Sequence, residues 1–218
     1  FTDMTSLDGI DPRHGGIAAA FADLDSDGMM DLYVAVWNDT LAGETRDILG
    51  QDWWPGSTNR IYVNKGNGTF RRADRTGAEY LGGTHSVTTG DFNNDGYLDL
   101  YITTGGPEFL LEDKLYQNNG DGTFTDVSVA AGVANPEGKG LGVVCGDYDG
   151  DGWTDIFVAN DRVPDFLYHN NGDGTFTNVS TSAGVDDSGD QDGGVGWADY
   201  DNDGDNLGGE LVDENLCS

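Results

Sequence analysis

Four segments of the chain place Asp, or in one case Asn, at alternate positions, a spacing that suits the coordination of a hard metal ion. The third segment, Asp147-Tyr148-Asp149-Gly150-Asp151-Gly152-Trp153-Thr154-Asp155, reads D-x-D-x-D-G-x-x-D. Ca²⁺ takes about 6–8 oxygen ligands, and a glycine at the sixth position permits the sharp turn that folds them around one ion. The pattern predicts a calcium loop, with Asp147, Asp149, Asp151 and Asp155 as side-chain ligands and the carbonyl of Trp153 as a further ligand.

The same pattern occurs at three other places, two of them complete. The predicted ligands are Asp23, Asp25, Asp27, the carbonyl of Met29 and Asp31 in the first loop, Asp91, Asn93, Asp95, the carbonyl of Tyr97 and Asp99 in the second, and Asp199, Asp201 and Asp203 in the fourth. A single such loop could be a simple polar turn, because Asp, Asn and Gly all favour turns. Three complete copies favour calcium, with about three sites and a fourth incomplete one.

The four loops are expected to differ in affinity. The third has four Asp side chains, whereas the second has the amide Asn93 in place of one of them. The fourth has Leu207 at the ninth position and should be weak or empty. Substitution of Asp155 by alanine should therefore cost more stability than the same change at Asp203.

The residues that flank the loops indicate strands and not helices. An EF-hand needs an acid at position twelve and a helix on each side. Position twelve here is Val34, Ile102 or Val158, each within a short β-branched and aromatic run that is typical of a strand. The calcium loop is therefore predicted to join two strands.

The loops belong to a repeat with four strand signals. A run enters each loop, a second leaves it, a third contains a tyrosine (60–63, 114–117 and 166–169), and a fourth follows a glycine-rich hairpin turn that ends at Phe70, Phe124 or Phe176. Such a unit recurring about every 50 residues is typical of a propeller blade. We expect an all-β chain of β-propeller-type four-stranded blades, with about three full blades and partial terminal elements.

The predicted boundaries follow from the repeat. Residues 1–218 form a single repeat region, divided into a trailing strand of a preceding or closing blade (1–10), a blade with an inserted loop at 38–59 (14–80), two further blades (81–133 and 138–185) and a truncated blade (193–218). The terminal elements, including Phe1–Thr5, leave one blade without its middle strands. We therefore expect that the chain is part of a longer propeller or that copies of it associate.

Composition limits the possible partners. With 10 Lys and Arg against 40 Asp and Glu, the formal net charge is −30, which disfavours nucleic acid and anionic membrane as partners. No apolar run approaches the roughly 18 residues of a membrane span. Aromatic residues make up 11% of the chain, too many for a disordered acidic polypeptide.

The loops, the N-x-G-D-G-T-F turn of residues 118–124 and 170–176, and the trailing F-T-D-V-S…A-G-V of residues 124–133 resemble FG-GAP/VCBS repeats. Such repeats build the calcium-binding β-propellers of integrin α subunits and of many secreted proteins. The chain is most similar to the group that resembles cartilage acidic protein and is associated with an ASPIC/UnbV domain. This resemblance implies calcium in the loops, an extracellular, periplasmic or cell-surface location, and a role in binding. The chain departs from the family pattern in two ways. Phe-Thr-Asp-Val-Ser replaces the Phe-Gly core of the repeat, and the chain holds about three and a half blades, whereas integrin-type propellers have seven.

The inserted loop of the first repeat contains two adjacent tryptophans, Trp53 and Trp54. Paired aromatic rings in a loop could stack on a sugar or anchor a protein partner. They could equally fold back over the blade edge as a small satellite core. The sequence leaves these two interpretations open.

Catalytic patterns are not found in the sequence. The three histidines occupy unrelated repeat positions, and no Ser or Cys lies in a nucleophile motif with a base. We expect a non-enzymatic, calcium-stabilised module that binds or adheres to a protein or carbohydrate ligand. The alternatives are a self-associating structural subunit of an extracellular or cell-surface assembly and a secreted hydrolase or lyase on a propeller scaffold.

Overall fold

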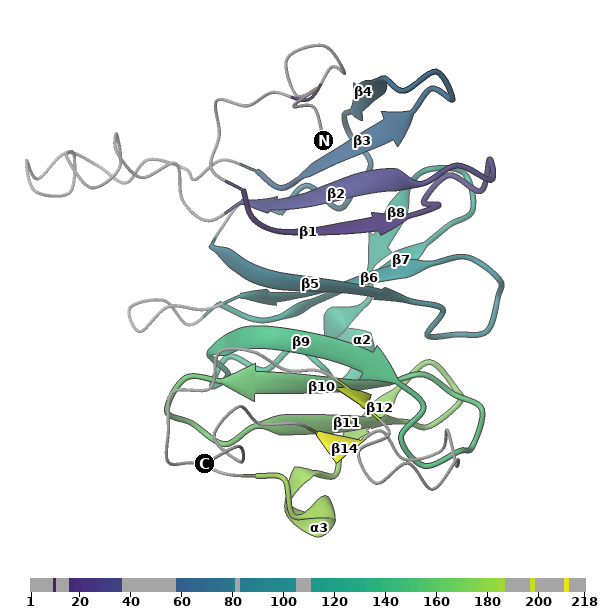
Figure 1. Cartoon of the computed structure of the whole chain (residues 1–218). Coiled ribbons are helices and arrows are strands. Elements are labelled where there is room, and N and C mark those ends of the chain that lie inside the picture. Colours follow the sequence, from purple (N-terminus) through teal and green to yellow (C-terminus); the bar gives the residue numbers. More distant parts are fainter. Residues whose placement is uncertain are drawn as a thin grey trace, which may run out of the picture.

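The computed structural model describes residues 10, 16–36, 58–80, 83–104, 111–186, 197–198 and 210–211. Within them, three four-stranded antiparallel sheets follow one another along the chain (Figure 1). The strands, in order within each sheet, are β1 (Gly16–Ala22), β2 (Asp31–Val36), β3 (Arg60–Asn64) and β4 (Phe70–Ala73); β5 (Thr84–Gly90), β6 (Asp99–Thr104), β7 (Lys114–Asn118) and β8 (Phe124–Asp126); and β9 (Gly140–Gly146), β10 (Asp155–Asn160), β11 (Phe166–Asn170) and β12 (Phe176–Asn178). The predicted all-β fold of four-stranded units is confirmed.

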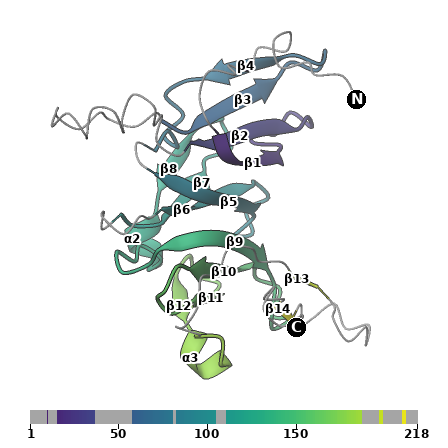
Figure 2. The ribbon, with the colours of Figure 1, turned by 60° about the vertical axis from the view of Figure 1, so that its left-hand side comes forward.

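The three sheets stack face to face, and their first strands lie next to one another (Figures 1 and 2). β5 of the middle sheet contacts both β1 and β9. One apolar cluster fills the space between the first two sheets and includes Leu24, Tyr33, Ile61, Leu100 and Tyr116. A second lies between the middle and third sheets and includes Phe92, Tyr101, Val143, Ile156 and Tyr168. Because the middle sheet is covered on both faces, every residue of β6 is buried.

Two one-turn helices differ from the expectation of strand throughout each repeat. They are α2 (Ser128–Ala131) and α3 (Ser180–Ala183), and each follows the last strand of its sheet. At α2, Asp126 Oδ1 accepts a hydrogen bond from Ser128 N at 3.0 Å, which turns the chain out of the strand. Gly132 ends the helix with a φ of 81°, a conformation that glycine adopts without strain.

The residue before the third strand of each sheet ties that strand to the end of the second. In the first sheet Val36 N donates to Asn59 Oδ1 at 2.8 Å, and Asn59 Nδ2 donates to Tyr33 Oη at 2.8 Å. In the middle sheet Asp113 takes the same place, accepting from Thr104 N at 2.8 Å and from Tyr101 Oη at 3.1 Å. The first sheet thus shows that the amide of Asn59 can make the hydrogen bonds required at this buried position.

Substitution of Asp113 by asparagine is expected to stabilise the protein above neutral pH. Burial raises the pKa of Asp113 to about 7, partly offset by its hydrogen bonds to Thr104 and Tyr101 and by Lys114. A raised pKa in the folded state means that this carboxyl favours folding at low pH and loses that contribution as the pH rises from about 4 to about 7. Asp113→Asn should raise the free energy of unfolding at pH 8 by on the order of 2 kcal/mol.

Urea denaturation of both proteins in saturating Ca²⁺, at pH 5 and at pH 8, measures this difference. The gain at pH 8 should exceed the gain at pH 5. An equal effect at the two pH values would contradict an ionised, buried Asp113.

The last described strands bracket the fourth aspartate segment. β13 (Trp197–Ala198) pairs with β14 (Glu210–Leu211) in antiparallel fashion. The predicted ligands Asp199, Asp201 and Asp203 lie outside the described residues, as do Trp53, Trp54 and the terminal segment Phe1–Thr5. Among the described residues, no helix has the length and hydropathy needed to cross a membrane.

Candidate metal centres

The three complete aspartate loops lie at the same end of the stacked sheets, on the right in Figure 1. Each connects the first strand of a sheet to the second: β1 to β2, β5 to β6, and β9 to β10. The sixth-position glycine has a φ of 85° at Gly28 and of 90° at both Gly96 and Gly152. Side chains with a Cβ rarely adopt this conformation, which explains why the motif needs glycine there.

The first aspartate of each loop shapes the turn. In the third loop Asp147 Oδ1 accepts hydrogen bonds from Gly150 N at 2.8 Å and Asp151 N at 3.1 Å, and its Oδ2 accepts one from Gly152 N at 2.9 Å. Asp23 and Asp91 accept equivalent bonds from the fifth and sixth residues of their loops. These bonds hold the carboxylates of the first, third and fifth positions on the inside of one turn.

The ninth-position aspartates are the most deeply buried charged groups of the loops, with exposed fractions of 0% for Asp31, 2% for Asp99 and 0% for Asp155. Asp99 Oδ2 accepts a hydrogen bond from Phe92 N at 3.1 Å, and Asp99 Oδ1 accepts one from Asn118 N at 2.8 Å. Asp31 and Asp155 make the same pair of bonds in their sheets. This residue therefore fastens the loop to the end of the third strand, a role that the sequence did not reveal.

The asparagines that end the third strands of the middle and third sheets extend this link to the neighbouring sheet. Asn118 Nδ2 donates to the carbonyl of Leu98 in its own sheet and to that of Leu24 in the first sheet, both at 3.0 Å. Asn170 Nδ2 likewise donates to the carbonyls of Thr154 and Phe92, at 3.0 and 2.8 Å. The order of each loop is thus coupled to the packing of one sheet on the next.

The seventh-position side chains also join loop and hairpin. A Cβ atom added to Gly120 would lie 2.6 Å from the ring of Tyr97, and one added to Gly172 would lie 2.8 Å from the ring of Trp153. In the first sheet Met29 lies against Gly66 in the same way. The seventh residue was predicted to offer its carbonyl oxygen to an ion, and its side chain packs over the turn that follows the third strand.

The carboxylates of the first and third loops gather closely enough to share an ion. One carboxylate oxygen from each of Asp23, Asp25 and Asp27 lies within 4.8 Å of the others, and Asp147, Asp149 and Asp151 form the same kind of group. Asp25 Oδ1 is buried and has no hydrogen-bond partner among the described residues. Since a buried carboxylate oxygen normally has a partner, this atom fits a ligand to a cation.

The electrostatics of the loops also favour a bound cation. Burial raises the pKa of Asp25, and the neighbouring carboxylates of Asp27 and Asp23 raise it further. The pKa of Asp99 and of Asp155 rises to about 6, mainly through burial and in part through nearby loop aspartates. A divalent ion among these groups would offset both effects.

The second loop differs through its amide. Asn93 Nδ2 donates to Asp95 Oδ2 at 2.8 Å, so that one carboxylate oxygen of the predicted site is engaged by a neighbour within the loop. The predicted ligands Asp91, Asp95 and Asp99 are nevertheless placed on the same turn framework as in the other loops.

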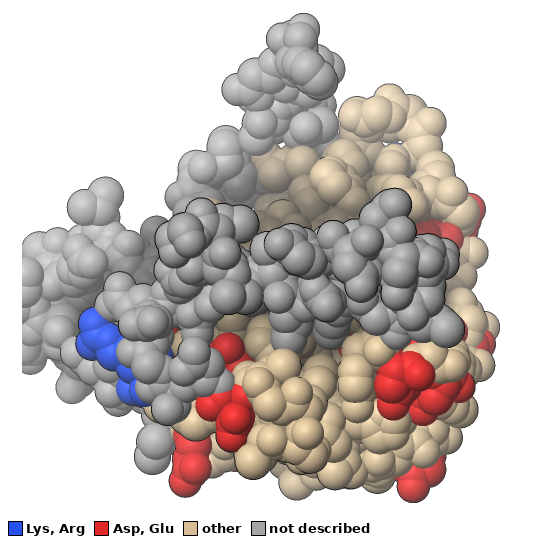
Figure 3. All heavy atoms as spheres, turned by 60° about the horizontal axis from the view of Figure 1, so that its bottom comes forward, with Lys and Arg blue, Asp and Glu red and all other residues tan. Residues whose placement is uncertain are grey.

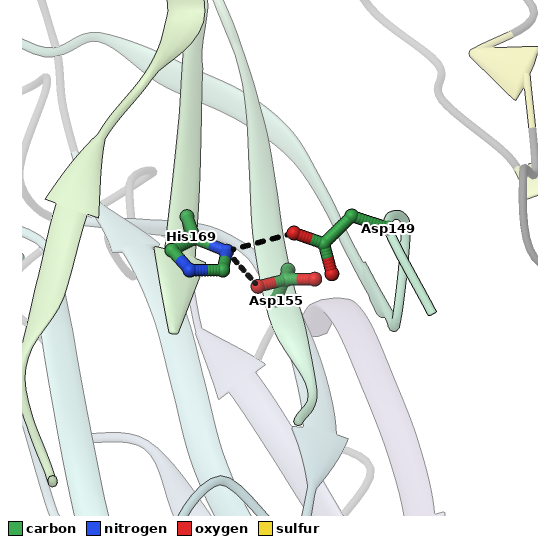
Figure 4. Close-up of side chains that lie close together, drawn as sticks. All are labelled: Asp149, Asp155 and His169. Carbon is green, nitrogen blue, oxygen red and sulfur yellow. Dashed lines mark ion pairs between the residues drawn. The ribbon is translucent and has the colours of Figure 1, made fainter. Parts of the chain in front are cut away.

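A further residue that sequence reasoning missed lies beside the third loop. His169 on β11 lies beside two predicted ligands, with Nδ1 3.2 Å from Asp149 Oδ2 and 3.6 Å from Asp155 Oδ1 (Figure 4). The equivalent residues of the other sheets are Val63 and Gln117. The antiparallel pairing of β10 with β11 sets Tyr168 opposite Ile156 and so brings the next residue, His169, next to Asp155. A comparison of the third strands across the three repeats would have singled out this histidine.

Acidic side chains are spread over the surface of the molecule (Figure 3). On the face shown in Figure 3, Asp and Glu side chains form separate groups, whereas visible Lys and Arg side chains are confined to one small area. This distribution accords with the net charge of −30 and disfavours contact with a polyanion.

Sequence and structure comparisons give the following similarities. The FG-GAP-like repeat family matches residues 44–102, 111–158 and 147–206, which together make up more than half of the chain. Cartilage acidic protein 1 from Homo sapiens is 29% identical over 208 residues, and its Mus musculus counterpart is 29% identical over 216 residues. Each alignment covers 89% of this chain and 30% of the relative, so that the chain spans less than a third of these proteins. A chain of the Photorhabdus luminescens Tc holotoxin pore has a TM-score of 0.39 and 19% identity, covering 81% of this chain and 7% of that one.

Proposed function

The chain belongs to the FG-GAP-like repeat family, and from this premise we propose that it is a calcium-stabilised extracellular module that binds a protein or a carbohydrate and performs no chemistry of its own. The observation that carries the proposal is the repeated loop framework, which lies at the same end of the three four-stranded sheets (Figure 1) and brings three carboxylates close together in the first and third loops. The similarity to cartilage acidic protein 1, which is named for cartilage, supports the proposed location.

Calcium in these loops would act on the packing of the sheets. The ion would be held by the side chains of the first, third, fifth and ninth positions and by the seventh carbonyl. It would neutralise carboxylates that otherwise repel one another. Because Asp99 is hydrogen-bonded to Asn118, and Asn118 to the neighbouring sheet, order in the loop favours a fixed arrangement of the blades. A rigid array of blades is a suitable base for binding loops.

Conversion of Asn93 to aspartate is expected to raise the calcium affinity of the second loop about tenfold, because calcium affinity rises with the number of charged ligands. The change also removes the hydrogen bond from Asn93 Nδ2 to Asp95 Oδ2 and frees that oxygen for the ion. Titration with Ca²⁺, followed by NMR at the amide of Gly96, reports on this loop alone.

The matched control for this prediction is Asn94→Asp. It adds the same charge one residue further on, at a non-ligand position with a φ of 54° that aspartate tolerates. If both variants tightened calcium binding equally, general electrostatics and not ligation would explain the gain.

The binding role is tested by presenting the calcium-loaded chain to arrays of extracellular-matrix proteins and glycans, and by repeating the assay in chelator. We expect saturable binding that requires Ca²⁺, and we expect replacement of both Trp53 and Trp54 by alanine to weaken it if the inserted loop carries the contact. Turnover of a polysaccharide by the purified chain would instead support the hydrolase or lyase alternative.

One structural observation favours a second candidate, the self-associating subunit. Ile17 and Phe21 on β1 are 53% and 64% exposed, although both are large and apolar. Light scattering over a range of protein concentrations in Ca²⁺ distinguishes the two candidates. Concentration-dependent assembly would support the subunit, and a constant monomer mass would support the binding module.

A further inference from the structure

The third loop has a nitrogen donor that the other two lack. His169 projects from β11 toward the carboxylates of Asp149 and Asp155 (Figure 4). One ligand atom from each of these three residues lies within 4.8 Å of the others. The equivalent positions hold Val63 in the first sheet, which offers no donor, and Gln117 in the middle sheet, which offers no imidazole.

The Nδ1 atom of His169 faces the carboxylates of Asp149 and Asp155. It is buried and has no hydrogen-bond partner among the described residues, although Asp149 Oδ2 is only 3.2 Å away. A buried ring nitrogen normally donates or accepts a hydrogen bond. Nδ1 lies at ion-pair distance from two carboxylates and has hydrogen-bond geometry to neither, a placement that suits a nitrogen which shares a cation with them.

The separations between the three residues fit a small ion. Zinc–nitrogen and zinc–oxygen bonds are about 2.0–2.2 Å long, which sets neighbouring ligand atoms of a tetrahedral site about 3.4 Å apart. The observed separations from His169 Nδ1 are 3.2 Å to Asp149 and 3.6 Å to Asp155. On the far side of the ring, His169 Nε2 lies 3.9 Å from Asp151 Oδ2. This is an ion-pair distance and too long for a hydrogen bond, so Asp151 adds negative charge beside the second ring nitrogen without fixing its orientation.

The ring is also held in place from the side. Tyr148, the second residue of the loop, contacts His169 edge to face, with ring centroids 6.2 Å apart and an interplanar angle of 86°. Asp155 is fixed by its bonds from Tyr148 N and Asn170 N. Two of the three donors therefore need little rearrangement to meet an ion.

We propose that the third loop, through His169, Asp149 and Asp155, is a mixed nitrogen–oxygen site that prefers a divalent transition ion such as Zn²⁺ to Ca²⁺. The inference rests on the proposed function, since it assumes that the loops bind metal ions. Imidazole favours Zn²⁺ and its neighbours in the first transition series, whereas a set of oxygen donors alone favours Ca²⁺. The first and second loops remain oxygen sites.

The test compares the chain with His169→Gln, which installs the side chain found at the equivalent position of the middle sheet. Calorimetric titrations with Zn²⁺ alone and with Ca²⁺ alone are paired with long-range ¹H–¹⁵N spectra of the imidazole. We expect Zn²⁺ to shift the His169 Nδ1 resonance strongly, and His169→Gln to weaken Zn²⁺ binding at the third loop about tenfold or more while changing its Ca²⁺ affinity less than about threefold. Unchanged Zn²⁺ affinity in the variant, or an Nδ1 resonance that ignores Zn²⁺, would overturn the inference.

Two further variants make the outcome unambiguous. Gln117→His places an imidazole beside the second loop. A new Zn²⁺ preference at that loop would support the role of this strand position, because misfolding cannot create a metal preference. Asp149→Asn should weaken both ions at the third loop. Ca²⁺ binding detected at the amides of Gly28 and Gly96 tests the calcium-stabilised module separately from the Zn²⁺ preference of the third loop. It would support the module even if His169 bound no ion. If no loop binds any ion, both fail.

Discussion

Replacement of Asp99 by alanine should lower the free energy of unfolding by about 3 kcal/mol even in a chelator. The carboxylate of Asp99 accepts hydrogen bonds from Phe92 N and Asn118 N, and the residue is almost fully buried. Alanine leaves both backbone donors without partners, and each buried unsatisfied donor costs about 1–3 kcal/mol. The removal of a desolvated carboxylate, whose pKa burial raises to about 6, returns part of that loss. Urea denaturation in the presence of a chelator measures the effect.

The matched control for Asp99 is Asp95→Ala in the same loop. Both residues are predicted ligands, but Asp95 is exposed, and its hydrogen bonds stay within the turn. In chelator the Asp95 variant should lose less than about 1 kcal/mol, and in Ca²⁺ both variants should lose the contribution of the ion. Equal losses in chelator would contradict the structural role assigned to the ninth-position aspartate.

Removal of calcium is expected to have the second large effect. An ion that binds only the folded chain contributes about 2.7 kcal/mol for each site when its concentration is 100 times its dissociation constant. For a protein of this size, 1 kcal/mol corresponds to about 2–4 °C in melting temperature, so that three loaded loops should raise the Tm by roughly 15–30 °C. Mg²⁺ should restore little of this, because it demands shorter bonds and regular octahedral geometry.

Thermal melting in Ca²⁺, in chelator and in chelator with excess Mg²⁺ tests this expectation. The order of the three melting temperatures is the critical result: Ca²⁺ well above Mg²⁺, and Mg²⁺ close to chelator. A Tm that did not respond to chelation would contradict the calcium sites. Full rescue by Mg²⁺ would show that the loops are clusters of negative charge that do not discriminate between divalent cations.

The parts of the fold that the sequence predicts are those encoded by local spacing. Alternating aspartates with a glycine at the sixth position identify the loops, and the β-branched runs around them identify the strands, as the positive φ of Gly96 and the bounds of β6 show. The helix Ser128–Ala131 was missed because one turn is too short to produce a helical period. Its formation depends on the turn in which Asp126 Oδ1 accepts a hydrogen bond from Ser128 N, and on Gly132 at its end.

Features that depend on the pairing of distant segments could not be inferred from spacing. Asn170 was identified only as the first residue of a turn, yet its side chain bonds to Phe92, 78 residues earlier in the chain. His169 was assigned no role because its partner Asp155 lies on another strand, and only the register of β10 and β11 brings them together. The fully hydrogen-bonded ninth aspartates have the same origin, since their second donor, Asn118 N in the case of Asp99, lies beyond the second strand.

The central claim, that the three complete loops bind calcium, is tested most directly by counting the ions. Native mass spectrometry of the folded chain, dialysed against millimolar Ca²⁺, gives the number of ions bound, and NMR at the amides of Gly28, Gly96 and Gly152 shows where they bind. The account predicts one Ca²⁺ at each of these three loops, with the second released first as free Ca²⁺ is lowered. A folded chain that carries no Ca²⁺, with the three glycine resonances unchanged across the titration, would contradict it.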